Sequence, residues 1–245
     1  MKIRIFLLLS MLSMLIPVAA FSMEKATMKN SQQLDRRQQA IIPIAAFTAS
    51  GDVDRLKQAL ARGLDAGLTI NEAKEVMVHL YAYAGFPRSL NGLGTLMTLV
   101  DERTKQGIED IVGKEATPVP ADFDRDEYGG QVRAKLAGLE KDATGAKWQM
   151  FTPVIDTFLK EHLFADLFVR DVISHQDREL ATISALASMT GTEGQLGFHL
   201  GAAMNTGLTE SQLKEFVEVL GSQVGSKQAE SADQLLDKVL SSRSE

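Results

Sequence analysis

Two histidine-centred groups are the candidates for chemistry in this sequence. His199 follows Gln195 by four residues, so both lie on one face of a predicted helix. Glu179 lies twenty residues before His199, in the first turn of the preceding predicted helix. The alternatives are a buried histidine without a function and an acidic residue that only stabilises a helix N-terminus. If the two helices form an antiparallel hairpin, the carboxylate can lie beside the imidazole, which is then suited to act as a general acid or base.

The second group surrounds a helix break at Gly85. His79 and Tyr83 are four residues apart and share a helix face, and Arg88 follows the break. A guanidinium in this position can bind a substrate carboxylate through two hydrogen bonds. The alternative for Arg88 is an ordinary surface arginine. We expect His79, Tyr83, Arg88 and Gln195 to bind the substrate.

Several classes of chemistry are excluded by composition and motif. The sequence has no cysteine, which excludes thiol nucleophiles, disulfides and zinc-thiolate sites. It has no histidine and carboxylate spacing typical of a metal site, no nucleophile elbow and no glycine-rich phosphate loop. The formal net charge of −6 gives no basic surface for nucleic acid. We therefore expect the protein to act on or bind a small molecule. We expect it to have no metal, no cofactor and no nucleic-acid partner.

The sequence predicts that helices position these residues, and the same set of predicted helices occurs twice along the chain. Residues 41–85 align with 181–225 at a constant offset of 140 without a gap, and eleven of the forty-five positions are identical. The identities include the Gly-Leu-Thr turns at 67–69 and 207–209. No segment shows the alternation of a half-buried strand. The sequence therefore predicts an all-α protein with tandem duplicated helical units, which pack as a pseudo-dimer within one chain because each amphipathic hairpin needs an apolar partner.

Local signals mark the predicted helix ends. Gly67 can take the left-handed conformation that ends a helix. Thr69 with Glu72, and the corresponding pair in the second unit, have the spacing of a capping box. Thr192 with Gln195 has the same spacing and predicts a third box.

The predicted organisation has four parts: residues 1–22 as a signal peptide, 31–112 as the first unit, 113–147 as a linker and 148–245 as the second unit. Within the linker, 113–130 is rich in proline, glycine and acidic residues, which disfavours a packed helix. The lone Trp148 at the start of the second unit is expected to anchor packing rather than to stack on a ligand.

The N-terminal segment has the three parts of a secretory signal. Lys2 and Arg4 precede an uncharged apolar stretch at 5–16, and small residues follow up to Ala20 and Ser22, after either of which cleavage is expected. An uncleaved membrane anchor is the alternative. We expect a periplasmic or secreted protein with no stable membrane insertion after cleavage.

Two blocks of the chain resemble the carboxymuconolactone decarboxylase family, which also contains the alkylhydroperoxidase D-type thiol reductases. These blocks are Arg178-Glu-Leu-Ala-Thr-Ile-Ser-Ala-Leu186 followed by His199 and Asn205-Thr-Gly-Leu-Thr209, and Tyr83-Ala-Gly-Phe-Pro-Arg-Ser-Leu-Asn91. The resemblance covers about 41–103 and 151–243. It implies an all-helical fold built from helical hairpins that assembles into trimers or hexamers. For this two-unit chain we expect a homo-oligomer, with a trimer of chains favoured over a hexamer.

The same resemblance bears on activity. The peroxidase branch has a Cys-x-x-Cys pair, whose positions correspond to Thr192 and Gln195, whereas the family histidine and glutamate correspond to His199 and Glu179. This departure argues against a thiol peroxidase. The decarboxylase branch also lacks the pair, and its cofactor-free reaction removes carbon dioxide from a lactone with a proton shift. The resemblance implies that His199 carries the proton.

Three functions are therefore compared. The first is a cofactor-independent lyase or isomerase acting on a small carboxylated lactone-like compound, with His199 and Glu179 as the acid-base pair and Arg88 on the carboxylate. The second is a non-catalytic exported protein that binds a small molecule in the same pocket. The third is a hydroperoxide reductase, which the missing cysteines disfavour.

The duplication predicts one composite site rather than two equivalent ones. At the offset of 140, each unit lacks the chemical groups that the other retains, so the two sets can meet at one interface between the units. The corresponding pairs are Glu179 and Gln39, His199 and Ala59, Tyr83 and Gln223, and Arg88 and Gln228.

Overall fold

The computed structural model describes residues 32–243, and the predicted signal peptide lies outside this range. The described chain is helical, without strands. Its elements are α2 (Arg36–Ser50), α3 (Val53–Asp65), α4 (Ile70–Ala84), α5 (Phe86–Lys105), α6 (Arg125–Ala137), α7 (Lys147–Phe151), α8 (Pro153–Thr157), the π-helix η1 (Phe158–Leu167), α9 (His175–Ala187), α10 (Glu193–Asn205), α11 (Glu210–Gln223) and α12 (Ser226–Arg243). No helix within 32–243 is long and apolar enough to cross a membrane. The predicted all-α class is confirmed.

The helix boundaries repeat at the offset found in the sequence. Both ends of α3 differ from those of α10 by 140 residues, and α4 and α5 begin 140 residues before α11 and α12. Residues 32–243 thus contain two four-helix units, α2 to α5 and α9 to α12. The described part of the first unit contains no counterpart of α6 to η1.

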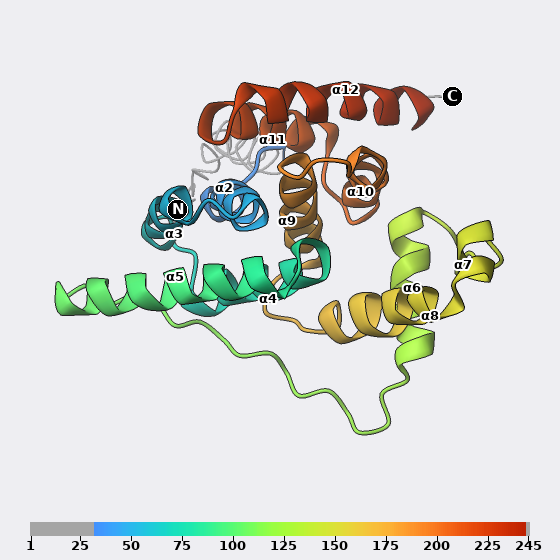
Figure 1. Cartoon of the computed structure of the whole chain (residues 1–245), viewed down its shortest axis with the longest axis horizontal. Helices are drawn as coiled ribbons and strands as arrows, with labels where there is room; N and C mark the ends of the chain where they lie inside the picture. Colours follow the sequence, from blue (N-terminus) through green and yellow to red (C-terminus); the bar gives the residue numbers. More distant parts are fainter. Residues whose placement is uncertain (1–31, 244–245) are drawn as a thin grey trace, which may run out of the picture.

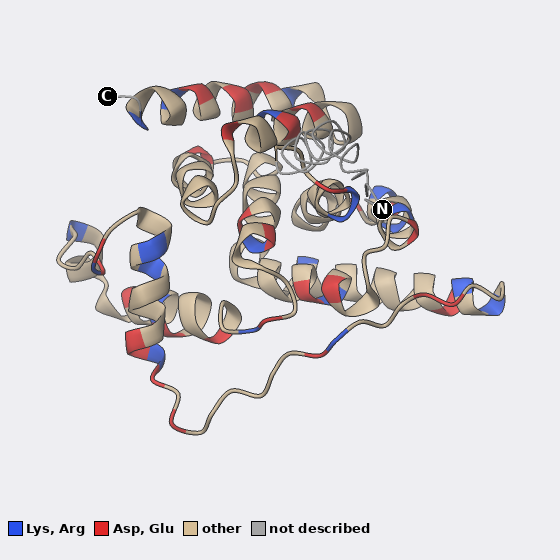
Figure 2. Ribbon diagram, turned by 180° about the vertical axis from the view of Figure 1, so that it is seen from behind, with Lys and Arg blue, Asp and Glu red and all other residues tan. Residues whose placement is uncertain are grey.

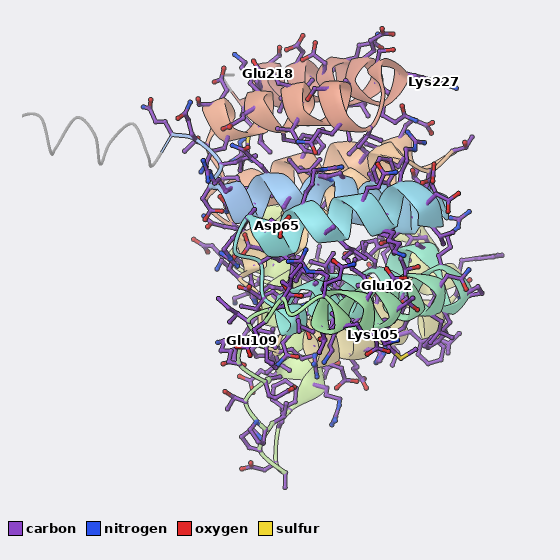
Figure 3. The ribbon with its side chains drawn as sticks, turned by 90° about the vertical axis from the view of Figure 1, so that its left-hand side faces the viewer. Asp65, Glu102, Lys105, Glu109, Glu218 and Lys227 are labelled. Atoms are coloured by element: carbon purple, nitrogen blue, oxygen red, sulfur yellow. The ribbon has the colours of Figure 1, made fainter. Side chains whose placement is uncertain are left out.

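The two units meet through their first helices. Helices α2 and α9 pack against each other at the centre of the molecule, and a shared apolar core joins both units (Figure 1). Residues 41–49 of α2 are all buried, because this helix is apolar around its whole circumference. Figure 3 shows α11 and α12, which carry Glu218 and Lys227, on one side of α2 and α3, and α5, which carries Glu102 and Lys105, on the other.

The predicted helix ends are confirmed at most positions. The capping boxes that begin α4 and α11 are both formed, and Gly67 has a φ of 96°. The third box is wrong. Thr192 precedes α10 without a capping bond, because its hydroxyl donates instead to the carbonyl oxygen of Leu186 at 2.8 Å.

The linker is more structured than its composition indicates. Two stretches are free of helix, 108–124 and 138–146, and α6 lies between them, beginning at Arg125. Gly129 lies inside α6, where a Cβ atom would overlap the carbonyl oxygen of Lys160 in η1. The glycine therefore permits close packing of α6 on η1 rather than breaking a helix.

The region from α7 to η1 exposes many large apolar side chains. Trp148 is 47% exposed, so it is not the buried packing anchor that we expected. The other exposed members of this surface are Met150, Phe151, Val154, Ile155 and Phe158. A run of this kind is unusual on an isolated chain and is typical of a surface that a partner covers.

Candidate functional site

The hairpin of α9 and α10 brings the predicted acid-base pair together. Nδ1 of His199 lies 2.8 Å from Oε2 of Glu179, and both residues are buried. A carboxylate only accepts hydrogen bonds, so the proton of a neutral His199 is on Nδ1 and the lone pair is on Nε2. Nε2 has no partner within 32–243, and the side chain keeps 7% of its surface exposed. The free nitrogen can therefore exchange a proton with a ligand.

Helix α4 of the first unit adds Tyr83 to this pair. The rings of Tyr83 and His199 pack edge to face with centroids 5.5 Å apart. The Tyr83 hydroxyl is buried without a partner among the described residues, as is Oε1 of Glu179. Burial and the nearby Glu179 carboxylate raise the pKa of Tyr83, so its hydroxyl stays protonated. The site thus contains an unused hydrogen-bond donor.

His79 lies one turn before Tyr83 on α4, with ring centroids 5.3 Å apart. Its Nε2 is 2.8 Å from the Thr182 hydroxyl, which donates its own proton to the carbonyl oxygen of Arg178. His79 must therefore donate from Nε2, and its Nδ1 faces an Arg178 nitrogen at 3.5 Å. Burial, followed by the Arg178 charge, lowers the pKa of His79 well below its usual range. His79 is thus held neutral in one tautomer.

A buried cluster of ion pairs lies next to the His79 ring. Arg178 is fully buried and donates to Oε1 of Glu75 at 2.7 Å and to the carbonyl oxygen of Arg170 at 2.6 Å. Arg170 binds both oxygens of the same glutamate. Figure 2 shows the corresponding charged segment in the otherwise uncharged α9. Our sequence analysis did not single out Glu75, Arg170 or Thr182. It named Arg178 only as the first residue of the block that resembles the family.

The remaining predicted residues lie apart from this cluster. Gln195 is exposed one turn before His199 on α10 and forms no hydrogen bond with a described residue. Arg88 is exposed on α5, and no hydrogen bond or ion pair joins it to the described part of the chain. The structure therefore brings His199, Glu179, Tyr83 and His79 together, and no hydrogen bond or ion pair joins Arg88 to them.

Comparison with models of known protein families shows to which family the chain belongs. The model of the carboxymuconolactone decarboxylase family matches residues 18–96 and 153–238, which together exceed half of the chain. The chain belongs to this family. No curated protein matches it. The two matched regions correspond to the two units, so the tandem arrangement expected from the internal repeat is supported by the family match as well.

As a member of the carboxymuconolactone decarboxylase family, the chain keeps only one complete set of polar residues. The corresponding position between α2, α3 and α11 holds a cavity of about 160 Å³ whose wall includes Gln39, Ala59 and Gln223. These are the counterparts of Glu179, His199 and Tyr83 at the offset of 140. The polar set is thus formed from α4 of one unit and α9 and α10 of the other, and its pseudo-symmetric position lacks the imidazole and the phenol. No cluster of histidine and carboxylate side chains within 32–243 could hold a metal ion.

Proposed function

We propose that this family member is a cofactor-independent lyase or isomerase that moves a proton on a small lactone-like compound. The observation that carries the proposal is the buried pair of His199 and Glu179, in which one imidazole nitrogen is bound and the other is free. This arrangement fixes the tautomer that a general base needs. The proposal does not use Arg88, because no hydrogen bond or ion pair joins that side chain to the pair.

The proton transfer follows from the hydrogen bonds. Nε2 of His199 removes a proton from the carbon next to a lactone carbonyl, and the electron pair of the broken C–H bond moves onto the carbonyl oxygen. The resulting imidazolium is stabilised by Glu179, which accepts from Nδ1. Return of the proton to another carbon completes an isomerisation without an oxidant or a reductant. A positioned proton carrier of this kind contributes a rate factor of roughly 10² to 10⁴.

Tyr83 and His79 have separate parts in this proposal. Tyr83 packs its ring against the His199 ring and supplies a protonated hydroxyl without a protein partner, which suits stabilisation of the developing oxyanion. His79 is a positioning residue, since it donates a hydrogen bond to Thr182 and packs against Tyr83 but forms no hydrogen bond with His199 or Glu179.

The proposal is tested with α-angelica lactone, whose conversion to the conjugated isomer needs only removal and return of a proton. We expect the protein to catalyse this conversion, followed by ultraviolet absorbance, and to introduce solvent deuterium into the product. His199→Gln should lose at least a hundredfold in kcat/KM while keeping the circular dichroism spectrum. His162→Gln, the same change at an exposed histidine, is the matched control. No conversion by the wild-type protein, or full activity of His199→Gln, would contradict the proposal.

A non-catalytic binding protein is the second candidate. It is favoured by the loss of the polar residues from the pseudo-symmetric position, which is also expected of a protein that only binds. This candidate predicts that small lactones raise the melting temperature without being converted. A hydroperoxide reductase is not proposed, because reduction of a peroxide by a protein dithiol needs two cysteines and the chain has none.

Export and self-association are further parts of the proposal. The N-terminal pattern supports secretion to the periplasm or beyond. The intact mass of the exported protein should correspond to a chain without its first 20 residues, if cleavage follows Ala20, or its first 22, if it follows Ser22.

The exposed apolar surface from α7 to η1 supports a homo-oligomer, with a trimer expected from the family. Light scattering that gives a monomer at all concentrations would contradict the oligomer.

A further inference from the structure

A cavity of about 580 Å³ opens beside the N-terminal half of α10. Its volume lies within the range of small-molecule sites, and its walls come from α6, α7, η1 and α10. The aromatic part of the wall consists of Trp148, Phe164 and Phe198. Apolar and aromatic walls are typical of sites that bind a ring compound by excluding water.

The cavity lies next to the acid-base pair. Gln195 in its wall is one turn before His199 and on the same face of α10. The Phe198 ring, also in the wall, packs edge to face on His199 with centroids 5.1 Å apart. Phe164 belongs to the apolar cluster against which Tyr83 packs. A residue that contacts the His199 ring thus forms part of the wall, whereas His199 itself does not line the cavity.

The arginine of the wall is already paired. Arg133 donates through Nε and Nη2 to both oxygens of Asp142 and through Nη1 to Asp156. One arginine thus faces two carboxylates, and Lys160, outside the wall, also interacts with Asp156. A ligand carboxylate would meet these two carboxylates without gaining a free cation from the wall.

The two glutamines of the wall differ in whether their side-chain amides are free to bind a ligand. The side chain of Gln149 donates to the carbonyl oxygen of Ala143 and to Asp156 and accepts from the amide of Ala146. Gln195 has no hydrogen-bond partner in the described chain. Its amide can therefore donate to an oxygen of the ligand and fix the orientation of the ligand toward His199.

We propose that this cavity is the substrate pocket and that it selects an uncharged ring compound with a carbonyl or lactone oxygen, which Gln195 binds. This inference rests on the proposed function of His199 and Glu179. It also chooses between the two reactions proposed above. A substrate without a carboxylate has no carbon dioxide to lose, so the reaction at this site is the proton shift of an isomerase.

The protein carries its own reporter for this proposal, because Trp148 is the single tryptophan of the chain and lies in the cavity wall. The probes are phthalide, a neutral aromatic lactone, and phthalide-3-carboxylate, which differs by one negative charge. We expect phthalide to change Trp148 fluorescence saturably and the carboxylate to bind at least tenfold more weakly. Equal or tighter binding of the carboxylate would overturn the proposal.

A cavity-filling variant locates the binding site. A Cβ atom at Gly194, in the cavity wall, meets no atom within 4 Å, so the side chain of Gly194→Leu begins in open space, and we expect it to extend into the cavity. Gly94→Leu is the matched control, because Gly94 is also helical and open but lies on α5 in a different hollow. We expect Gly194→Leu to weaken phthalide binding at least tenfold and Gly94→Leu to leave it unchanged. Unchanged binding by a folded Gly194→Leu would overturn the proposal.

Two further variants separate this proposal from the proposed function. Gln195→Ala should weaken phthalide binding, whereas His162→Gln, at an exposed histidine outside the cavity wall, should bind phthalide as the wild-type protein does. If phthalide binds as expected and no lactone is isomerised, the pocket stands and the proposed function fails. If α-angelica lactone is isomerised through His199 while Gly194→Leu and Gln195→Ala both bind phthalide normally, the function stands and the pocket proposal is wrong.

Discussion

Nδ1 of His199 and Oε2 of Glu179 lie 2.8 Å apart, and the other oxygen of this glutamate has no partner within 32–243. The carboxylate thus has a single bonded neighbour, the imidazole. Because only an acceptor faces Nδ1, the lone pair of a neutral His199 is on Nε2. The position of the His199 lone pair therefore depends on the side chain at 179, which as a carboxylate can only accept a hydrogen bond.

Glu179→Gln should remove this control with little change in shape. An amide can donate to Nδ1, which places the proton on Nε2 and leaves no lone pair for the substrate. We expect kcat for lactone isomerisation to fall by about 10² to 10⁴, as is typical when a proton carrier loses its function. Glu193→Gln, at an exposed glutamate in the first turn of α10, is the control and should keep wild-type kcat. Comparable kcat values for the two variants would contradict the role of Glu179.

Tyr83→Phe should have opposite effects on stability and activity. The variant keeps the ring that packs on His199 and removes a buried hydroxyl that has no partner. Because an unsatisfied buried polar group costs about 1–3 kcal/mol, we expect the free energy of unfolding in urea to rise by about 1 kcal/mol. We also expect kcat to fall about tenfold or more, since the oxyanion loses a donor. Tyr81→Phe is the control, because its hydroxyl pairs with His162 outside the site. A less stable variant with full activity would contradict this role for Tyr83.

The sequence predicted the parts of the site that depend on periodicity. A constant offset of 140 placed both helical units, and helix spacing alone put His79 beside Tyr83. The approach of Glu179 to His199 needed one more assumption, an antiparallel hairpin. These features are local or follow from the repeat, so no knowledge of the packing between the two units was required for them.

The ion-pair cluster could not be predicted in this way. Arg178 and Glu75 are separated by 103 residues, and their pairing depends on the crossing of α4 with α9 between the units. Composition also misled us at Gly129, where glycine permits α6 to approach η1 closely. At Thr192 the capping spacing was present, but the hydroxyl found a better acceptor in the carbonyl oxygen of Leu186.

The duplication supplies a matched test of the buried cluster. Glu75 and Glu215 are counterparts at the offset of 140, but Glu75 binds two arginines, whereas Glu215 accepts only from the amide of Leu34 and from Gln39. Glu75→Gln leaves the fully buried Arg178 without a carboxylate, so we expect it to cost about 3–5 kcal/mol in the free energy of unfolding.

Glu215→Gln should cost about 1–2 kcal/mol, because it weakens hydrogen bonds without leaving a buried charge unpaired. Urea unfolding of both variants measures the difference. Equal losses would show that Arg178 does not depend on Glu75 for its burial.

His79 should make the stability of the protein depend on pH. Its pKa in the folded state lies well below the usual value, because of burial first and the Arg178 charge second. As pH falls through about 6.5, the unfolded chain takes up a proton at this position and the folded protein does not, so the free energy of unfolding decreases. This loss continues until pH reaches the folded pKa, at up to about 1.4 kcal/mol per pH unit for one group.

Above about pH 6.5 both states hold a neutral His79 and the residue contributes no pH dependence. Burial also lowers the pKa of His175, which therefore acts in the same direction. The two contributions are separated by variants. His79→Gln should flatten the profile of urea-unfolding free energy between about pH 7 and pH 5 by roughly 1 kcal/mol or more, and His175→Gln should flatten it less, because that side chain is less deeply buried. A wild-type protein that gains stability on acidification through this range, or a His79→Gln variant with an unchanged profile, would show that His79 is not held neutral against Thr182 and Arg178.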